Sequence, residues 1–473
     1  MEGDAEDPGA RVIELRQVSR ALAALALAAT ASCGTLPTIV PDMGQGPSRA
    51  VRLEGTRGPL SAQESKAILA RMESRGVETG IFDRHLALEE GVAGSPLTVG
   101  NRMALLQDGP ATYSAMFAAI AGARDHIHME TYIIEDDEVG RKFAAALVAR
   151  QAQGVEVALI YDSVGSIGTP KEFFKNLTDN GVKVVEFNPV NPLTAKAGWD
   201  VSQRDHRKQL IVDGRSAFLG GINISSVYSG GSSPRHSSAR PPGSPPWRDT
   251  HMRVEGPVVA DFQKLFLDTW AKQKGTPLAS RNHLPQLGAK GGELVRAIGS
   301  TPDDPFSLIY ATLISAIGAA ESSVLLTNAY FVPDPQLLAA LNGAAARGVD
   351  VRIILPGKTD SWLVFHAGRS FYSELLRGGV KIYERRDALL HAKTAVIDGV
   401  WSTVGSTNLD WRSFLHNDEV NAVILGPEFG AQMRRVFEAD IDASDAITPE
   451  RWRSRAIGDH ARETAARIWA YWL

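Results

Sequence analysis

Short apolar runs alternate with amphipathic stretches along most of the chain, and the same order occurs twice. Residues 113–120 and 310–317 have the apolar spacing of a helix with one buried face. A β-rich run follows each of them, at His126 to Ile134 and at Val324 to Val332. Two more pairs of short apolar runs match in the same order: residues 154–160 with 348–354, and residues 181–186 with 379–384. Such runs are typical of strands buried between helix layers, so the pattern predicts an α/β fold with a parallel or mixed sheet.

A repeat of roughly 200 residues is too long for a solenoid, and we interpret it as a duplicated domain. The polar, glycine-containing stretch from Leu278 to Glu293 marks the boundary between the copies. The predicted fold class is α/β, with two tandem α/β/α sandwich domains related by internal duplication. The expected division of the chain is a targeting segment, an N-terminal extension and two domains, at residues 1–33, 34–95, 96–285 and 286–473.

The first 33 residues have the order of an export signal. Arginines precede an Ala/Leu run from Ala21 to Ala29, and small residues then lead to Cys33. The run of about a dozen apolar residues is too short to span a bilayer as a lone helix. We expect a lipoprotein-like signal and a bacterial membrane location, peripheral or lipid-anchored; the alternatives are an uncleaved anchor and an ordinary short helix. Further on, Ser61 and Glu64 have the spacing of a capping box at the start of a helix from Ser61 to Arg75.

Composition narrows the classes of function. The 473-residue chain is 44% hydrophobic and 22% charged, as expected of a folded globular protein. Its net charge of −4 provides no overall basic field for a polyanion, so no nucleic-acid partner is expected. A single cysteine excludes a disulfide framework or a cysteine-based zinc site within one chain. The sequence carries no indication of oligomeric state.

The strongest signal is a His-x-Lys-x4-Asp motif that occurs in both copies. The offset between the copies is 185 at each position (391−206, 393−208, 398−213). A small-residue turn ending in asparagine follows each motif at the same distance. The candidate residues are His206, Lys208, Asp213 and Asn223 in the first copy, and His391, Lys393, Asp398 and Asn408 in the second.

These residue types suit a phosphodiester substrate. Side chains two apart on a strand face the same side, so His and Lys of each motif point into one site. Lysine and asparagine can hold the non-bridging oxygens, while one imidazole attacks phosphorus and the other protonates the leaving oxygen. A metal is not expected in this site, because the ammonium groups of Lys208 and Lys393 would repel a divalent ion.

Further carboxylates recur outside the motifs. Asp249 and Glu419 each lie seven residues before a Gly-Pro pair. We expect each to bond to one nitrogen of a catalytic imidazole and fix its orientation, with a surface salt bridge as the alternative. Asp213 and Asp398 end their strands, and the sequence leaves open whether they act in the chemistry or hold turns.

The duplicated motif resembles the signature of the phospholipase D superfamily, and most closely that of bacterial cardiolipin synthases. The resemblance covers Asn101 to the C-terminus and includes residues 130–140, 247–257 and 405–413. It implies two phospholipase D-type domains, phosphatidylglycerol as substrate, no cofactor, and a covalent phosphohistidine formed by His206, with His391 as proton donor and then acceptor. It also implies an acidic residue near the site at Glu130, with Asn328 as its counterpart in the second copy.

Two other functions use the same residues. A hydrolase would release phosphatidic acid or cleave another phosphodiester, and would differ only in using water as the acceptor. A non-catalytic lipid-binding protein is the third class, although both histidines are intact. The first copy also carries a stretch rich in Ser, Gly and Pro from Ser225 to Pro246, which we expect to be a flexible, solvated loop.

Overall fold

The computed structural model describes residues 53–73, 81–86, 96–191, 200–232 and 245–473. All of them belong to one compact unit, residues 39–473. The expected targeting segment and Cys33 lie outside the described residues. Within the described residues, no helix combines the length and the apolarity needed to cross a bilayer.

The first half of the chain builds a mixed sheet. Its three parallel strands are rich in buried apolar residues, as in β5, where six of the seven residues of EVALIYD are buried. Antiparallel strands continue the sheet on one side of them. In spatial order the strands are β6 (Lys183–Phe187), β5 (Glu156–Asp162), β4 (His126–Thr131), β8 (Lys208–Val212), β9 (Ser216–Gly220), β11 (Thr250–Glu255) and β3 (Leu97–Gln107).

The second half repeats this order strand for strand, which confirms the predicted duplication. One further antiparallel strand, β20 (Ser444–Ile447), is added at its outer edge. In spatial order the strands are β15 (Lys381–Arg385), β14 (Asp350–Pro356), β13 (Ser323–Asn328), β17 (Lys393–Ile397), β18 (Trp401–Gly405), β19 (Asn417–Leu425) and β12 (Glu293–Ser300).

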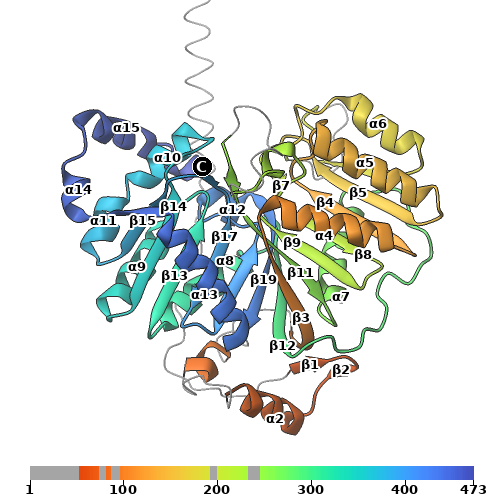
Figure 1. Cartoon of the computed structure of the whole chain (residues 1–473), viewed down its shortest axis with the longest axis horizontal. Helices are drawn as coiled ribbons and strands as arrows, with labels where there is room; N and C mark the ends of the chain where they lie inside the picture. The colour runs from red at the N-terminus through yellow and green to blue at the C-terminus, as the bar shows by residue number, and fades with distance from the viewer. Residues whose placement is uncertain (1–52, 74–80, 87–95, 192–199, 233–244) are drawn as a thin grey trace, which may run out of the picture. The chain divides into compact units, whose positions relative to one another are not determined.

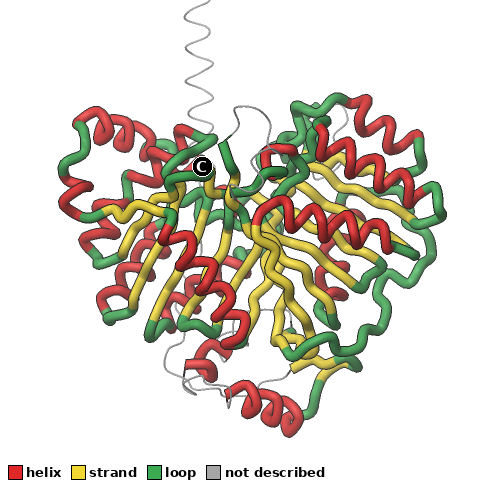
Figure 2. Tube along the Cα trace, viewed as in Figure 1, coloured by secondary structure: helices red, strands yellow, loops and turns green. Residues whose placement is uncertain are grey.

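The two sheets are joined edge to edge, because β3 pairs antiparallel with β12. The result is one continuous sheet of 18 strands among the described residues (Figure 2). The chain between Lys272 and Glu293, the connector, contains no helix or strand. The N-terminal strands β1 (Leu53–Gly55) and β2 (Gly58–Pro59) pair with each other, and β1 also pairs in parallel with the start of β3.

The helix predicted after Ser61 is confirmed as α2 (Ala62–Glu73). Its capping box is formed: the Ser61 backbone N–H donates to Glu64 Oε2 at 2.9 Å, and the Glu64 N–H donates to Ser61 Oγ at 3.2 Å. The reciprocal bonds satisfy backbone donors that a helix start otherwise leaves open.

Helices cover both faces of the sheet (Figure 1). In the first half α4 (Asp108–Gly122), α5 (Glu138–Gln151) and α6 (Lys171–Asp179) pack on one face, and α7 (Val259–Lys272) packs on the other. Apolar residues of α7 share a single core with those of α13 (Pro427–Asp442) from the second half. The predicted α/β architecture is therefore confirmed, and the two halves share buried apolar surface rather than merely touching.

The remaining helices belong mostly to the second half. Helix α8 is buried on nearly every side, and Ser307 caps its start by accepting from the Tyr310 N–H through Oγ. Asp334 caps the start of helix α9, which has a proline at its first helical position. Their bounds and those of the shorter helices are α8 (Leu308–Ala319), α9 (Pro335–Ala346), α10 (Trp362–Arg369), α11 (Tyr372–Arg377), α12 (Trp411–Leu415), α14 (Pro449–Arg453), α15 (Ile457–Arg467), η2 (Ser226–Tyr228) and η4 (Ala470–Trp472).

Two very short parallel pairings cross from one half to the other. β7 (Arg204–Asp205) pairs with the start of β19, at Asn417 and Asp418. β10 (Trp247–Arg248) pairs with β16 (Leu389–Leu390). Each pairing ends one residue before a motif histidine and one residue before a candidate carboxylate, so the crossing strands determine how these side chains meet.

Candidate active site

Each motif histidine is fixed through its backbone to the opposite half of the chain. The His206 N–H donates to the Asp418 carbonyl at 2.9 Å, and the His391 N–H donates to the Arg248 carbonyl at 2.8 Å. The next residue after each acceptor is a candidate carboxylate. Crossed strand pairing therefore brings segments more than 140 residues apart in sequence into one site.

The carboxylates pair with the imidazoles crosswise. Glu419 Oε1 lies 2.9 Å from His206 Nδ1, and Asp249 Oδ2 lies 2.8 Å from His391 Nδ1. An ionised carboxylate only accepts, so each Nδ1 carries the proton and each Nε2 presents a lone pair when the ring is neutral. The bond expected between each imidazole and a carboxylate is present, and both carboxylates are fully buried rather than part of a surface salt bridge.

The two imidazole–carboxylate pairs have different supports. Glu419 accepts from Ser406 Oγ at 2.5 Å and from Asn417 Nδ2 at 3.2 Å. At the position matching Ser406 the first half has Gly221, where an added Cβ would lie 2.3 Å from Asp249 Oδ1. Gly221 leaves room for the Asp249 carboxylate, which lies too close to the Gly221 backbone for a side chain to fit there. This Gly-to-Ser difference between the two asparagine turns is visible in the sequence and is the signal that identifies Ser406.

Aromatic rings border both imidazoles. The Tyr132 ring lies 4.9 Å from the His206 ring, and the Trp247 ring lies 5.5 Å from the His391 ring, between centroids. Tyr228 Oη lies 3.2 Å from His391 Nδ1. Tyr228 is buried in η2, so the first residues of the stretch predicted as a solvated loop instead contribute to the site. Residues 233–244 of that stretch lie outside the described part of the chain.

The two lysines occupy equivalent positions. Lys208 Nζ donates to the His206 carbonyl and Lys393 Nζ to the His391 carbonyl, both at 2.5 Å. Burial lowers the pKa of Lys208 to about 7 and that of Lys393 to about 8, although the charges of Glu419 and Asp249 oppose the shift. Because each ammonium lies in the field of both carboxylates, the two motifs form a single electrostatic environment.

The histidines are neutral near pH 7. Burial lowers the pKa of His206 to about 4, the nearby Lys208 charge acts in the same direction, and Glu419 opposes it. Burial and the Lys393 charge also lower the pKa of His391. Burial alone would raise the pKa of Glu419, but the His206 and Lys208 charges reduce it to about 2. At neutral pH the site thus contains an ionised carboxylate behind a neutral, nucleophilic imidazole.

The turn asparagines differ in their bonding. Asn223 is committed to the fold: its Oδ1 accepts from the Ile133 N–H at 3.2 Å and its Nδ2 donates to Tyr228 at 3.3 Å. Asn408 is buried, and its Oδ1 has no hydrogen-bond partner within the described residues. The Asn408 amide is therefore the freer of the two to bond to a substrate.

The motif aspartates do not reach the imidazoles. Asp213 accepts from the N–H groups of Arg124, Asp125 and His126, at 2.8 to 3.1 Å. Asp398 accepts from residues 321–323 in the same way. The lysines pair with the carboxyl ends of β4 and β13, whereas these aspartates lie at the amino ends, about 16 Å away at 3.3 Å per residue. This geometry favours the turn-holding alternative.

Glu130 is adjacent to the site but faces the other side of the sheet. The strand register pairs Glu130 with Gln209 and Thr131 with Lys208, so Glu130 and Lys208 point to opposite faces. Gln209 Nε2 donates to Glu130, and Arg207 Nη1 lies 3.8 Å from its Oε1. Glu130 thus belongs to a buried polar cluster behind His206.

The same register corrects the expected counterpart of Glu130. In the second half Lys393 pairs with Asn328 and Thr394 with Thr327. Asn328 is therefore equivalent to Thr131, and Thr327 is equivalent to Glu130. The prediction that Asn328 matches Glu130 is wrong by one residue, which is enough to change the face of the sheet.

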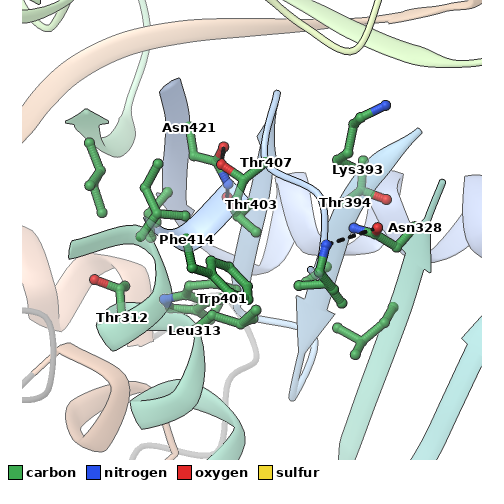
Figure 3. A pocket seen from close by; sticks show the side chains of 16 residues that line it. Thr312, Leu313, Asn328, Lys393, Thr394, Trp401, Thr403, Thr407, Phe414 and Asn421 are labelled. Atoms are coloured by element: carbon green, nitrogen blue, oxygen red, sulfur yellow. Dashed lines mark hydrogen bonds between the residues drawn. The ribbon is translucent and has the colours of Figure 1, made fainter. Parts of the chain in front are cut away.

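A small cavity lies beneath the second motif (Figure 3). It has a volume of about 30 Å³ and is lined by Leu313, Trp401 and Phe414 together with Asn328 and Lys393. In Figure 3 the Lys393 side chain extends away from the apolar residues of the lining. This volume holds one or two water molecules and no acyl chain, so the cavity is part of the protein interior.

Comparisons with known proteins agree with this geometry. The family model "Cardiolipin synthase, PLD-like domain" matches residues 116–228 and 313–441, one match in each half. The chain is 34% identical to a cardiolipin synthase of Halalkalibacterium halodurans over 80% of this chain and 74% of that protein. It is 36% identical to cardiolipin synthase A of Pseudomonas entomophila over 75% of this chain and 71% of that protein.

A solved structure supports the fold independently. The phosphatidylserine synthase of Haemophilus influenzae superposes with a TM-score of 0.62 at 13% identity, covering 81% of this chain and 99% of that one. At this identity the likeness concerns the fold alone. With the family match in both halves and the identity to curated relatives, the chain belongs to the phospholipase D superfamily and, within it, to the bacterial cardiolipin synthase-like family.

Proposed function

We propose that this protein is a phosphatidyltransferase that joins two phosphatidylglycerol molecules into cardiolipin and releases glycerol. The observation that carries the proposal is the crossed arrangement, in which His206 bonds to Glu419 and His391 bonds to Asp249. It places in one site two lysines and two imidazoles, each of which bonds to a carboxylate through Nδ1 and keeps Nε2 for the phosphate. Membership of the cardiolipin synthase-like family supports the choice of substrate.

The reaction proceeds in two displacements at phosphorus. His206 Nε2 attacks the phosphate of the first phosphatidylglycerol, so that a P–N bond forms while the bond to the terminal glycerol oxygen breaks. His391 Nε2–H donates its proton to that oxygen. The negative phosphate favours the protonated His391 that this step needs, against the lowering of its pKa by burial.

The second displacement reverses the roles. A hydroxyl of the second phosphatidylglycerol gives its proton to His391 and attacks phosphorus, and the P–N bond breaks. Lys208 and Lys393 offset the charge on the non-bridging oxygens in both steps. Glu419 stabilises the positive charge on the His206 ring while the phosphohistidine exists. The assignment of His206 rather than His391 as nucleophile rests on the family resemblance.

The acceptor distinguishes this proposal from a hydrolase. Purified protein is incubated with phosphatidylglycerol vesicles, and cardiolipin, phosphatidic acid and glycerol are measured by mass spectrometry. Cardiolipin and glycerol in equal amounts are expected. Phosphatidic acid without cardiolipin would assign the protein to the phospholipase D hydrolases instead.

Substitution of the nucleophile tests the residue assignment. His206→Ala is expected to lower turnover by at least about a thousandfold, because no P–N bond can form. The control is Lys175→Ala, which removes an exposed side chain of α6 outside the active site and should leave turnover unchanged. Full activity of His206→Ala would overturn the assignment.

We further propose that the protein binds the membrane surface through its C-terminal region. Helix α15 contacts α10, and η4 contacts α10 and α12. These elements, with the two residues between α15 and η4, expose large apolar side chains: Ile457 is 87% exposed, Ile468 78%, and Trp362 and Trp469 55% each. Aromatic residues are enriched at membrane interfaces. Helix α10 closely follows Asp360, whose carboxylate accepts from Tyr330 beside His391, so this surface adjoins the active site.

Vesicle binding tests this surface. Ile468→Asp combined with Trp469→Ala is expected to reduce co-sedimentation with phosphatidylglycerol vesicles by at least about fivefold, since both substitutions remove exposed apolar area. Leu284→Asp is the control, because Leu284 is also exposed but lies in the connector. Equal loss of binding in both proteins, or none in either, would contradict the proposed surface.

A further inference from the structure

Three imidazoles gather at the end of the first-half sheet that is opposite to the catalytic site. His126 and His128 lie on β4 and His283 lies in the connector, and their ring centroids are 4.6, 4.9 and 5.0 Å apart. The strand equivalences place Ser323 and Leu325 at the matching positions of β13. The fold therefore does not require histidines here, since the second half forms the same strand without them.

A carboxylate completes the group. Glu156, at the start of β5, lies across from His126 in the strand register. Ligand atoms of His128, Glu156 and His283 all lie within 4.8 Å of one another. Tetrahedral coordination at the usual Zn–N and Zn–O distances needs ligand atoms about 3.4 Å apart, so small side-chain rotations bring the three onto one ion.

One of the three ligand atoms is buried without a partner. His128 is fully buried, and its Nε2 has no hydrogen-bond partner within the described residues. An unpaired buried nitrogen is costly and calls for a ligand. The Phe266 ring stacks on the His128 ring at 4.5 Å between centroids, which fixes the plane of the imidazole.

A chain of polar groups can set the His128 tautomer. His126 Nδ1 lies 2.9 Å from an Asp125 oxygen. Gln263 lies between the two rings, with its Oε1 3.2 Å from His126 Nε2 and its Nε2 2.7 Å from His128 Nδ1. In this orientation the amide donates to His128 Nδ1, and the neutral His128 ring carries its proton on Nε2. Metal binding at Nε2 requires the Gln263 amide to turn over, so that its Oε1 accepts from His128 Nδ1–H and the Nε2 lone pair faces the ion.

The Glu156 carboxylate is divided between two sets of partners. Its Oε2 accepts from the Ala279 N–H at 2.6 Å as well as from Lys183. Lys183 Nζ occupies Glu156 Oε2 at 2.6 Å, whereas Oε1 faces His283 at 3.4 Å.

We propose that His128, Glu156 and His283 bind a divalent transition metal of the zinc class, which fastens the connector between the two halves to the first sheet. Two imidazoles and a carboxylate suit zinc, and the part-exposed His283 leaves a coordination position for water. The site is structural in role. It lies toward the amino end of β4, where His128 is three residues, about 10 Å, from Thr131, the strand partner of Lys208. It leaves the metal-free chemistry expected of the catalytic centre unchanged.

The first test measures metal binding by the full-length protein. The protein is stripped with chelator, dialysed against Zn²⁺, and analysed for metal content; a Co²⁺ titration followed by visible absorption reports the coordination geometry. One equivalent of zinc and the absorption of tetrahedral Co²⁺ are expected. Zinc content below about one-tenth of an equivalent in the wild-type protein would overturn the proposal.

Variants locate the ion. His283→Ala and Glu156→Gln should each weaken zinc binding by at least about tenfold, because even partners of metal ligands cost that much when removed. His460→Ala and His206→Ala, which remove an exposed and a catalytic imidazole, should bind zinc as the wild type does. Zinc binding that survives both ligand substitutions, or is lost with His206, would place the ion elsewhere and reject the site.

Proteolysis of the wild-type protein gives a readout that does not depend on any variant. Zinc at saturating concentration should slow cleavage within residues 273–292 by at least about fivefold, because the ion joins His283 to the sheet. Cleavage of the connector at the same rate with and without zinc would overturn the proposed fastening role.

Discussion

At the scale of single residues, the two motif histidines bond to carboxylates from the opposite half. Sequence reasoning predicted one carboxylate for each imidazole and identified both, Asp249 and Glu419. Their crosswise pairing was not predictable, because the periodicity within one half carries no information on the short pairings β7·β19 and β10·β16 between halves. Tyr228 was missed for the same reason, since its partner His391 lies 163 residues away. Ser406 differs, because it lies only 13 residues before its partner Glu419 in the same half.

The pH dependence of kcat/KM should show the unusual acidity of the lysines. A lysine is cationic below its pKa, and burial has lowered these values to about 7 for Lys208 and about 8 for Lys393. We expect kcat/KM to fall as the pH rises through 7 to 8, as the site loses the charge that holds phosphate. At the acid end it should fall near pH 4, where His206 becomes protonated.

Lys208→Arg is the matched variant for this profile. Its guanidinium stays charged throughout, so the alkaline fall should move to higher pH by about half a unit or more, whatever happens to the maximum rate. A profile that is flat from pH 6 to 9 in the wild-type protein would contradict the role of the lysines.

At the scale of secondary structure elements, the motif aspartates close the amino ends of their strands. Asp213 and Asp398 have φ of 55° and 52°, a left-handed backbone that few residues other than glycine, asparagine and aspartate adopt readily. From there each carboxylate accepts several N–H groups at the start of the neighbouring strand. Asp398 also bonds to His85 Nε2 at 3.0 Å, which joins residues 81–86 to the second half.

Asp398→Asn should therefore affect stability rather than chemistry. Burial would raise the pKa of Asp398, but hydrogen bonds from His85 and three backbone N–H groups lower it from 3.8 to about 2. A pKa lowered by this amount adds about 2 kcal/mol to the free energy of unfolding above pH 4. This contribution is lost as the pH falls through 2. Asparagine keeps the left-handed backbone, so we expect the unfolding free energy at pH 7 to drop by about 1–2 kcal/mol with turnover within about twofold.

For Asp398→Asn, the unfolding free energy in denaturant and the rate of lipid product formation are measured on the same preparation. Asp213→Asn is its control, because Asp213 makes the equivalent backbone bonds but, within the described residues, bonds to no histidine ring. Normal unfolding combined with a hundredfold loss of turnover would show instead that the aspartate acts in the reaction.

Element order was the most predictable level of the structure, because alternating helix and strand patterns and the repeated motif are local signals. The helix at Ser61 and the strands around both motifs follow from the sequence alone. The matching of Glu130 with Asn328 was wrong because residue alignment of two apolar strands leaves a shift of one residue undetermined, whereas cross-strand hydrogen bonding with β8 and β17 determines it. The imidazole cluster at His128 was missed because His283 lies in a segment without periodicity.

At the scale of the whole molecule, the active site lies within one chain. The two halves share one sheet through β3 and β12 and one apolar core through α7 and α13. Each half supplies one lysine, one imidazole and the carboxylate for the other imidazole. A working site thus requires both halves in the same folded unit.

Mixing two inactive variants tests this arrangement. Equal amounts of His206→Ala and His391→Ala protein are combined, and cardiolipin formation is measured after prolonged incubation. We expect no activity above the sum of the separate proteins, because the exchange of halves would have to break the continuous sheet. Recovery toward a quarter of wild-type activity would indicate a site assembled from two chains.

The crossed pairing has a consequence for biosynthesis. During translation the His206 segment leaves the ribosome 213 residues ahead of Glu419, and Asp249 leaves 142 residues ahead of His391. A nascent chain, or one truncated by premature termination, therefore exposes an unassisted imidazole and no working pair. The enzyme cannot modify lipids until nearly all of its polypeptide has been made. This timing follows from the pairing of strands between the two halves.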